Sequence, residues 1–370
     1  MNAPKLRFKE FNDGWQKKEL REISQIYDGT HQTPNYIQNG VPFVSVEDIS
    51  DIEKTNKFIS KNAFEKEFKI KPQVNDILMT RITAGIIGAT AIVKNNNPLG
   101  YYVSLALIRK NKEIDVNYLN QYINCFKFKK ELNKRIIHVA FPKKINLGDI
   151  GKCKISITSI NEQQKIGKML NILDRKIELQ SKKIEDLKLF KLSKYSSVFS
   201  KTNNKIKLSD ICIIEKGKQI NSDMLIEKGN YYMLNGGILP SGYLNEYNTN
   251  ENTITISEGG NSCGYVNFNK TKFWCGGHCY KIISPSVNTF YLYHLLKYNE
   301  KKIMDLRVGS GLPNIQKKDL KALKLSINKN DEQLKIGILF DTFDKKINLE
   351  TNKLDKLQKL KKGLMQRMFV

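Results

Sequence analysis

The sequence predicts an α+β protein in which two mixed α/β domains are separated by two long antiparallel coiled-coil helices, as a pseudo-two-fold internal repeat. Residues 161–199 recur 170 positions later as residues 331–369, with the Glu-Gln and Lys-Ile-Gly pieces aligned. Such a period indicates a duplicated module, because solenoid repeats are about 20–50 residues long. Short β-rich runs with glycine breaks precede both copies. We therefore expect domains at 1–155 and 201–324, and helices at 156–200 and 325–370.

Both recurring segments carry apolar residues at alternating steps of four and three, which is typical of a coiled-coil seam. At 1.5 Å per residue each helix would be about 57 Å long. Asn161 and Asp331 are the expected N-caps. The alternative is two separate amphipathic core helices. The predicted seam, with polar Gln180 and Glu350 facing each other at the midpoint, comprises Ile166, Leu170, Leu173, Ile177, Gln180, Ile184 and Leu187 in the first copy and Ile336, Phe340, Phe343, Ile347, Glu350, Leu354 and Leu357 in the second.

The charge balance predicts a polyanionic partner. The chain has 62 Lys and Arg against 37 Asp and Glu, a formal net charge of +25. Nucleic acid is the simplest such partner, and double-stranded DNA is our prediction. A general lysine bias accounts for part of the excess, and a membrane surface is the weaker electrostatic alternative. No apolar run approaches the roughly 18 residues of a membrane span, and the N-terminus lacks an apolar signal segment, so we expect a cytoplasmic protein.

Six scattered cysteines predict reduced thiols. One cluster, Cys275, His278 and Cys279 with Cys263 upstream, could supply zinc ligands. It lacks paired C-x2-C halves and lies in the aromatic, strand-like run FWCGGHCYKI. Strand and loop roles are therefore favoured over a metal site.

The usual catalytic motifs are missing from the sequence. It contains no G-x-x-x-x-G-K-[ST] phosphate loop, no G-x-S-x-G elbow and no H-E-x-x-H helix. Asn97-Pro98-Leu99-Gly100 comes nearest to the Asn-Pro-Pro-Tyr motif of amino-methyltransferases, but it lacks the second proline and the aromatic ring. We expect neither catalysis nor a bound cofactor in this chain.

Polar and glycine-rich segments are the candidate DNA contacts. Glycines let the main chain approach a ligand and expose N–H donors, and an Arg beside hydroxyls suits a phosphate or a guanine edge. For any single segment an ordinary hairpin loop is equally compatible. The predicted DNA-binding residues are Thr30, His31, Gln32, Thr33, Arg81, Thr83, Lys143, Lys144, Lys218, Gln219, Gly259, Gly260, Asn261, Ser262 and Asn314.

Three pieces of the sequence together resemble the specificity subunit of type I restriction–modification enzymes. The first is the run from Gly29 to Ile49, which contains Gly40-Val-Pro-Phe-Val-Ser45. The second is Asn235–Tyr243 with Thr253–Gly264. The third is the pair of Glu-Gln-x-Lys-Ile-Gly helices, each preceded by an Ile-Ser-Ile or Leu-Ser-Ile strand. The resemblance covers essentially the whole chain. Leu312 stands one position off from Phe141 in the repeat frame, and the second domain is shorter than the first.

The resemblance implies a non-catalytic subunit whose two target recognition domains each read one half of a bipartite, asymmetric DNA site. The helices would hold the domains apart and so set the spacer. Two modification subunits carrying S-adenosylmethionine would dock on this chain, and restriction subunits would complete the nuclease, with Mg and ATP also bound in partner subunits. Two other readings stay open: a free-standing methyltransferase or nuclease, and a coiled-coil adaptor that does not bind DNA.

Overall fold

The computed structural model describes residues 3–200, 204–309 and 311–369, so the predicted start of the second domain at 201–203 lies outside the described residues. The chain forms two compact units. Unit 1 comprises Met1–Gln180 and Lys353–Val370, and unit 2 comprises Ser181–Asn352. The two units therefore divide both long helices near their midpoints.

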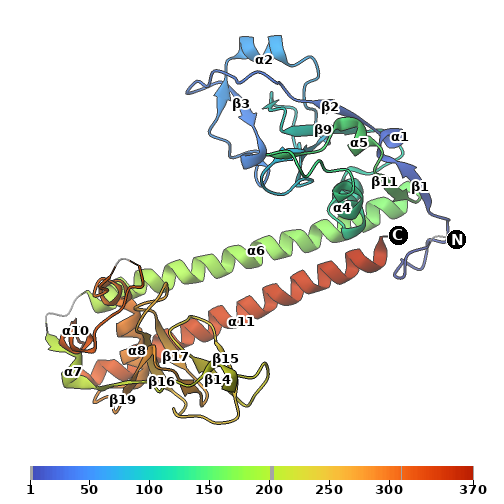
Figure 1. Ribbon diagram of the computed structural model, residues 1–370. Helices are drawn as coiled ribbons and strands as arrows, with labels where there is room; N and C mark the ends of the chain where they lie inside the picture. Colours follow the sequence, from blue (N-terminus) through green and yellow to red (C-terminus); the bar gives the residue numbers. More distant parts are fainter. Residues whose placement is uncertain (1–2, 201–203, 310, 370) are drawn as a thin grey trace. The chain divides into compact units, whose positions relative to one another are not determined.

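The centre of unit 1 is a four-stranded antiparallel sheet in the order β2–β9–β5–β7. Figure 1 shows β2 and β9 of this sheet. Its strands are apolar because one face packs on helices and the other faces a smaller sheet in the order β4–β3–β8. The strands of the two sheets are β2 (Ser24–Asp28), β9 (Leu105–Lys110), β5 (Ile77–Thr80), β7 (Thr90–Ile92), β4 (Phe58–Ile59), β3 (Val41–Val44) and β8 (Gly100–Tyr101).

Two further strand pairs and five short helices complete the first part of unit 1. Strand β1 pairs with β11, and β6 pairs with β10. These elements are β1 (Gln16–Glu19), α1 (Leu20–Ile23), α2 (Lys61–Glu67), β6 (Ile82–Thr83), α3 (Val116–Ile123), α4 (Phe126–Asn133), β10 (Lys143–Lys144), α5 (Leu147–Gly151) and β11 (Lys154–Ile157), with a 3-10 turn at Val46–Asp48.

Unit 2 repeats the two sheets and the outer strand pair of unit 1, but its described elements include no counterpart of the β6–β10 pair. Its central sheet has the order β13–β19–β16–β17, its smaller sheet β15–β14–β18, and β12 pairs with β20. Its elements are β12 (Lys205–Lys207), α7 (Leu208–Ile211), β13 (Ile213–Lys216), β14 (Tyr231–Leu234), β15 (Gly242–Leu244), β16 (Thr253–Ser257), β17 (Val266–Asn269), β18 (Trp274–Cys275), β19 (Cys279–Ile283), α8 (Thr289–Tyr298), α9 (Glu300–Met304), α10 (Lys317–Ala322) and β20 (Lys324–Ser326), with a 3-10 turn at Ser222–Met224.

The predicted duplication is confirmed by this equivalence of topology. In each unit the central sheet is antiparallel, while the smaller sheet contains one parallel pair, β3 with β8 and β14 with β18. The strands that the two units share also follow one another in the same order along the chain, while α2, β6 and β10 have no counterpart among the elements described in unit 2. The predicted fold class, an α+β pseudo-repeat with two long helices, is correct.

The long helices are α6 (Ile160–Phe199) and α11 (Asn330–Met368). Each begins one residue before the predicted N-cap, so Asn161 and Asp331 lie in the first turn. In α6 the reason is that the amide of Gln163 already donates to the carbonyl of Ser159, 3.0 Å away. No helix of the described residues combines the length and the apolarity that crossing a bilayer would require.

Ion pairs join the two helices within each unit. In unit 2, Lys183 pairs with Glu350 at 2.8 Å and Lys191 pairs with Asp344 at 2.5 Å. Residue numbers therefore rise along one helix as they fall along the other, so the helices are antiparallel. In unit 1, Lys361 pairs with Asp174. Lys361 lies 170 residues after Lys191, and Asp174 lies 170 residues before Asp344. The two ion pairs are therefore equivalent in the repeat.

All the predicted seam residues are buried or half-buried. Within unit 1, Ile166 and Leu170 share a core cluster with Met368 and Phe369 from the far end of the other helix. The predicted contact between Gln180 and Glu350 would join residues of different units and stays a prediction.

One aromatic residue closes the core of each unit. Phe369 packs against the rings of Tyr118 and Tyr122, with centroids 5.5 and 5.1 Å away. Phe199, its equivalent, packs against Tyr291 and Tyr298 at 5.9 and 5.4 Å. Each unit thus consists of a domain, the start of the helix that follows it, and the end of the other helix.

The equivalent helices α3 and α8 contact the long helices through different polar groups. In unit 1, Gln121 donates to Asn171 (2.8 Å) and Asp174 (2.6 Å). In unit 2 the same place holds His294, which is 1 % exposed and hydrogen-bonded through Nδ1 to the Tyr195 hydroxyl at 2.7 Å. Burial, helped by the nearby charge of Lys191 and opposed by Asp341, lowers the pKa of His294 to about 3.

This histidine predicts a pH-dependent stability for unit 2. Its folded pKa lies below the value of about 6.5 expected for the unfolded chain, so the unfolded state binds the proton first. The stabilisation is complete above about pH 6.5, the pKa of the unfolded chain's histidine, and is lost as the pH falls. Between pH 7.5 and 5 the expected loss is about 2 kcal/mol. Urea unfolding of His294→Gln, which copies unit 1, should show a flatter pH dependence.

The exposed His278 provides the matched control. His278→Gln should keep the pH dependence of the original chain. Native-state hydrogen exchange of amides in unit 2 would separate its unfolding from that of unit 1. An unchanged pH slope in His294→Gln would contradict this prediction.

Candidate nucleic-acid interface

In each unit, loops that are far apart in the sequence meet at one end of the central sheet. Asp28 and Thr80, the last residues of β2 and β5, lie opposite Ala106 and Leu105 at the start of β9. Because both strands run antiparallel to β9, the loops that follow them emerge at the same end. Register in unit 2 is the same, since Lys216 and Ser257 lie opposite Tyr280 and Cys279.

A third segment in each unit joins this end of the sheet. In unit 1 the segment 137–144, which we call tip loop 1, is closed by a bridge between Ile137 and Lys144. It is attached to the loop after β5 by the pairing of Lys143 with Thr83. Tip loop 2, at 308–314 in unit 2, is closed by Val308 and Asn314 and is attached through the bridge of Asn314 with Gly259. Residue 310 of tip loop 2 lies outside the described residues.

The structure brings the predicted DNA-binding residues together in two groups, one per unit. Thr30 to Thr33 follow β2, Arg81 and Thr83 follow β5, and Lys143 and Lys144 lie in tip loop 1. Lys218 and Gln219 follow β13, the segment 259–262 follows β16, and Asn314 lies in tip loop 2. The exposed members are His31, Gln32, Thr33, Lys143, Lys144, Lys218, Gln219, Asn261 and Asn314. Whether these residues contact DNA stays a prediction.

Arg81 has a different environment from the other candidates. It is 7 % exposed, and its Nη2 donates to Asp28 Oδ1 at 2.7 Å. The other oxygen of Asp28 lies 2.8 Å from Nε2 of the exposed His31. Arg81 thus connects the ends of β2 and β5 and holds the carboxylate that orients His31. A direct contact between Arg81 and DNA would require this ion pair to open.

Unit 2 holds the same ion pair with its charges exchanged. Lys216 takes the position of Asp28, and Glu258 takes the position of Arg81. Lys216 Nζ lies 2.6 Å from Glu258 Oε1. His278 places Nδ1 3.7 Å from the other oxygen of Glu258 and is exposed. A cation, a carboxylate and an exposed histidine therefore stand at the strand ends of both units. The more exposed member of the pair is the carboxylate Asp28 in unit 1 and the cation Lys216 in unit 2.

The sequence prediction missed Asp28, Lys216, Glu258 and His278. The available signal was position, because Asp28 and Lys216 directly precede glycines of the repeat, Gly29 and Gly217. A Cβ at Gly29 would lie 2.5 Å from the Tyr102 carbonyl oxygen, and one at Gly217 would lie 2.2 Å from that of Gly276. Close backbone approach requires glycine at both places. His278 was considered only as a zinc ligand.

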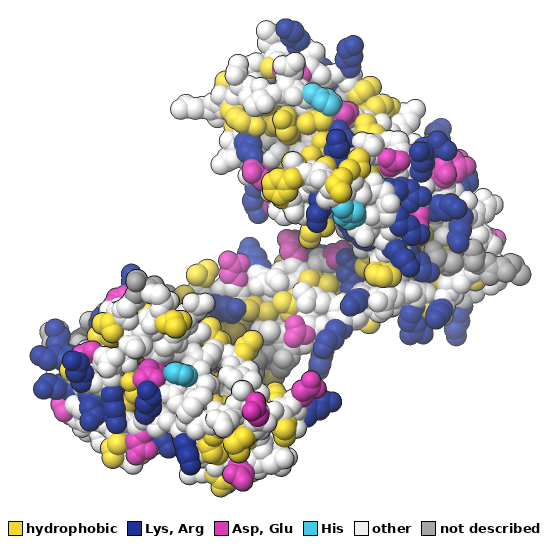
Figure 2. Space-filling model, viewed as in Figure 1, with side chains coloured by type: hydrophobic (Ala, Val, Ile, Leu, Met, Phe, Trp, Pro, Cys, Tyr) yellow, Lys and Arg dark blue, Asp and Glu magenta, His cyan; other side chains and the backbone are white. Residues whose placement is uncertain are grey.

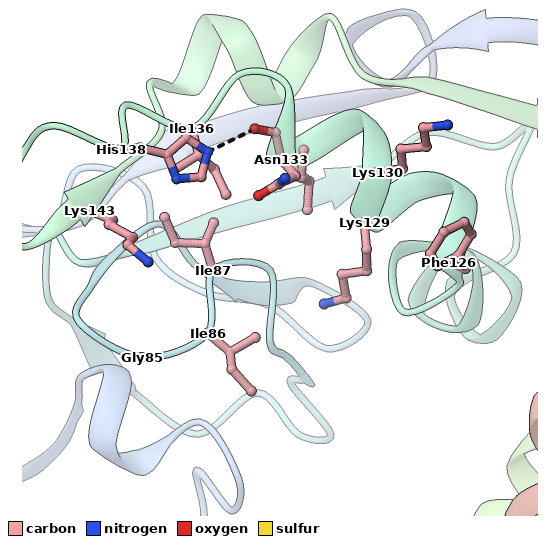
Figure 3. Close-up of a pocket in the computed structure, with 11 residues that line it drawn as sticks. Gly85, Ile86, Ile87, Phe126, Lys129, Lys130, Asn133, Ile136, His138 and Lys143 are labelled. Carbon is pink, nitrogen blue, oxygen red and sulfur yellow. Dashed lines mark hydrogen bonds between the residues drawn. The ribbon is translucent and has the colours of Figure 1, made fainter.

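Beside tip loop 1 lies a cavity of about 530 Å³ in unit 1. Figure 3 shows Ile86 and Ile87 on one side, α4 with Phe126, Lys129 and Lys130 on the other, and His138 and Lys143 at the tip loop. Burial lowers the pKa of Lys129 to about 8, and its Nζ donates to the carbonyl of Gly88. On the face seen in Figure 2, basic and hydrophobic side chains are intermingled over unit 1. This mixture suits a ligand that is both anionic and aromatic.

The cysteines of the possible zinc cluster lie in the interior. Cys275 and Cys279 belong to a small core cluster with Leu234 and Phe273, and Cys263 belongs to the main core of unit 2. A hydrogen bond with Cys279, together with burial, raises the pKa of Cys275. Among the residues that the structure describes, no three His, Cys, Asp or Glu side chains are grouped so that they could hold a metal ion.

The exchanged ion pairs predict a charge-swap experiment. Arg81→Glu alone leaves two carboxylates at the strand ends and should cost about 1–3 kcal/mol of folding free energy. The double variant Asp28→Lys, Arg81→Glu reproduces the polarity of unit 2 and should recover most of that loss. Urea unfolding of the two single variants and the double variant forms the cycle. A double variant as unstable as the sum of the singles would contradict the equivalence of the two pairs.

Comparison with known proteins gives the same two-part division. The family model "Type I restriction modification DNA specificity domain" matches this chain twice, at residues 12–189 and 200–359. A type I restriction enzyme MjaX specificity subunit of Methanocaldococcus jannaschii is 25 % identical over 98 % of this chain and 95 % of its own length. A type I specificity subunit of Mycoplasma pneumoniae is 32 % identical, but the match spans only 44 % of either protein.

The fold has solved counterparts. The crystal structure of a type I restriction-modification system S subunit from M. genitalium superposes with a TM-score of 0.75 over 100 % of this chain and 99 % of that one, at 19 % identity. A chain from a structure of the type I R-M system, described for its complex assembly and conformational transition, gives a TM-score of 0.55 at 16 % identity. With both of its units matched by the same family model, this chain belongs to the type I restriction modification DNA specificity domain family.

Proposed function

We propose that this chain is the non-catalytic DNA-reading subunit of a type I restriction–modification complex, in which each unit reads one half of a bipartite, asymmetric site. The observation that carries the proposal is the duplicated strand-end site with exchanged chemistry. Asp28 and Arg81 in unit 1 correspond to Lys216 and Glu258 in unit 2, and an exposed histidine from a different loop in each unit, His31 or His278, lies beside the carboxylate. Sequence is read by the donors and acceptors presented to base edges. Two sites with the same frame and different groups are suited to different half-sites.

The long helices support the rest of the proposal. They join the two DNA-reading units, so the length of the helices sets the number of unread base pairs between the half-sites. Two identical methyltransferase subunits would dock on the chain, because a pseudo-two-fold repeat presents the same surface twice. Exposed apolar residues occur at equivalent helix positions, Leu179 and Leu349 at 50 and 61 % exposure, and Phe190 and Leu360 at 50 and 53 %.

Catalysis belongs to the partners in this proposal. Methyl transfer from S-adenosylmethionine would take place in the modification subunits, and cleavage with Mg and ATP would require the restriction subunits. The polyanionic DNA is attracted by the net charge of +25. Steep weakening of binding with salt would distinguish this function from that of an adaptor without DNA.

Methylation mapping tests the proposal most directly. A host that expresses this chain with its modification subunits should carry methylated adenines in one bipartite motif, and either component alone should produce none. Replacing the segment 29–40 of unit 1 should change one half of the motif and leave the other half and the spacer unchanged. Methylation by this chain alone, or a replacement that altered both halves, would contradict the proposal.

The two lysines of tip loop 1 predict a change in salt dependence. Lys143 and Lys144 are exposed, and neither forms an ion pair with a described residue. If both contact phosphates, the double variant Lys143→Ala, Lys144→Ala should reduce the slope of log affinity against log salt by about 2. Affinity should fall similarly on specific and unrelated DNA, as measured by fluorescence anisotropy of the assembled complex.

The matched control removes the same charge elsewhere in unit 1. Lys17 and Lys154 are exposed on the β1–β11 pair. Their double alanine variant should leave the slope unchanged. Equal slopes for the two double variants would show that tip loop 1 makes no phosphate contact and acts only through net charge.

A further inference from the structure

Both tip loops present a bulky apolar residue directly before a proline. Phe141 is 94 % exposed and precedes Pro142, and Leu312 is 86 % exposed and precedes Pro313. Single exposed apolar residues are common on proteins. Here the same feature occurs in the tip loop of both units, one position apart in the repeat frame, although the tip-loop sequences differ. The proline ring restricts the backbone dihedral angles next to the apolar residue, and this limits the directions that its side chain can take.

Each tip loop is attached to the end of the sheet where the predicted DNA-binding residues lie. In unit 1 the amide of Ile145 donates to the carbonyl of Arg81 at 3.0 Å. In unit 2 the amide of Ile315 donates to the carbonyl of Glu258 at 2.8 Å, and Gly260 donates to the carbonyl of Pro313 at 3.0 Å. The backbone of the loop that carries the ion pair thus also carries the base of the tip. The apolar residue therefore belongs to a loop whose base is held at the proposed base-reading groups.

The chain around each tip is basic. The segment 134–146 contains four Lys or Arg residues and no Asp or Glu. The segment 306–318 contains three Lys or Arg residues and also no Asp or Glu. Lys143 and Lys144 are exposed next to Phe141. An exposed ring flanked by lysines is poorly suited to an apolar protein surface, which would have to bury the charges. It is well suited to DNA, where phosphates lie on both sides of a stack of apolar base faces.

We propose that Phe141 and Leu312 are wedge residues that insert between stacked base pairs, one in each half-site. The proposal rests on the function proposed above and adds a mode of contact to it. Apolar side chains such as Phe and Leu, inserted between base steps, unstack the bases and kink the duplex. The neighbouring lysines hold the phosphates while the wedge enters. Each unit thereby combines groups that read base edges with a group that deforms the DNA.

Fluorescence of 2-aminopurine tests the wedges, since this base is quenched by stacking and brightens when it is unstacked. The probe is a duplex with the motif found by methylation mapping, in which single adenines in or beside each half-site, excluding the methylated ones, are replaced. The complex of this chain with its modification subunits should cause a several-fold rise at one step in each half-site. Phe141→Ala should abolish the rise in the half-site of unit 1 alone, and Leu312→Ala the rise in the other.

Two further variants separate the wedge from general effects. Phe141→Leu keeps an apolar wedge and should keep the signal. Val74→Ala trims an exposed apolar residue of unit 1 at the other end of β5 and should also keep it. Native mass spectrometry checks that each variant assembles with the same number of modification subunits.

The outcomes are distinct. Binding of the duplex without any rise, or a rise that persists in Phe141→Ala and Leu312→Ala, would overturn the wedges and leave the proposed function standing. Loss of modification subunits from Phe141→Ala would show that the tip contacts protein and would also overturn the proposal. Failure of the original complex to bind the duplex would overturn the proposed function together with the wedges.

Discussion

The core of each unit depends on an aromatic residue at the end of a long helix. Phe369 ends α11 and is buried against the tyrosines of α3, and Phe199 ends α6 and is buried against those of α8. A buried phenylalanine contributes about 1.5–3 kcal/mol relative to an exposed one. Unit 1 therefore completes its core with a segment that is distant in the sequence, whereas unit 2 is the single segment Ser181–Asn352 and contains Phe199. The antiparallel course of the helices follows from this exchange, because each helix must begin in one unit and end in the other.

The polar contacts between helices show the same exchange. Asp174 with Lys361 and Asp344 with Lys191 are equivalent in the repeat, and each pair joins residues from both copies of the duplicated segment. Burial of Lys191 lowers its pKa, an effect that its bond with Asp344 opposes. Removing one partner of such a pair leaves a poorly solvated charge, so the pair favours one helix register over others.

Duplication kept the backbone and changed the side chains. The glycines that allow close backbone approach, Gly29 and Gly217, are the same in both units, whereas the ion pair beside them has exchanged its signs. Backbone geometry sets where the loops meet, and the side chains set what they present. Under the proposed function, this separation would let one fold recognise two different half-sites. The cavity beside α4 and the two apolar tips add surface to the same end of the sheet.

The sequence by itself determined the repeat, the two long helices and the fold class. The reason is that these features depend on the period of the repeat and on the spacing of apolar residues, which can be recognised without knowing the distant contacts. It also placed most candidate DNA residues in the loops that converge, because polar and glycine-rich segments mark loops. Helix starts were one residue late, as caps are set by local hydrogen bonds. Only the tertiary structure decided that Arg81 is buried on Asp28, that Lys216 and Glu258 reverse this pair, and that Phe141 and Leu312 are exposed in the tip loops of the two units. Each of these depends on which strands end together, and that is a property of sheet register, not of any local stretch of sequence.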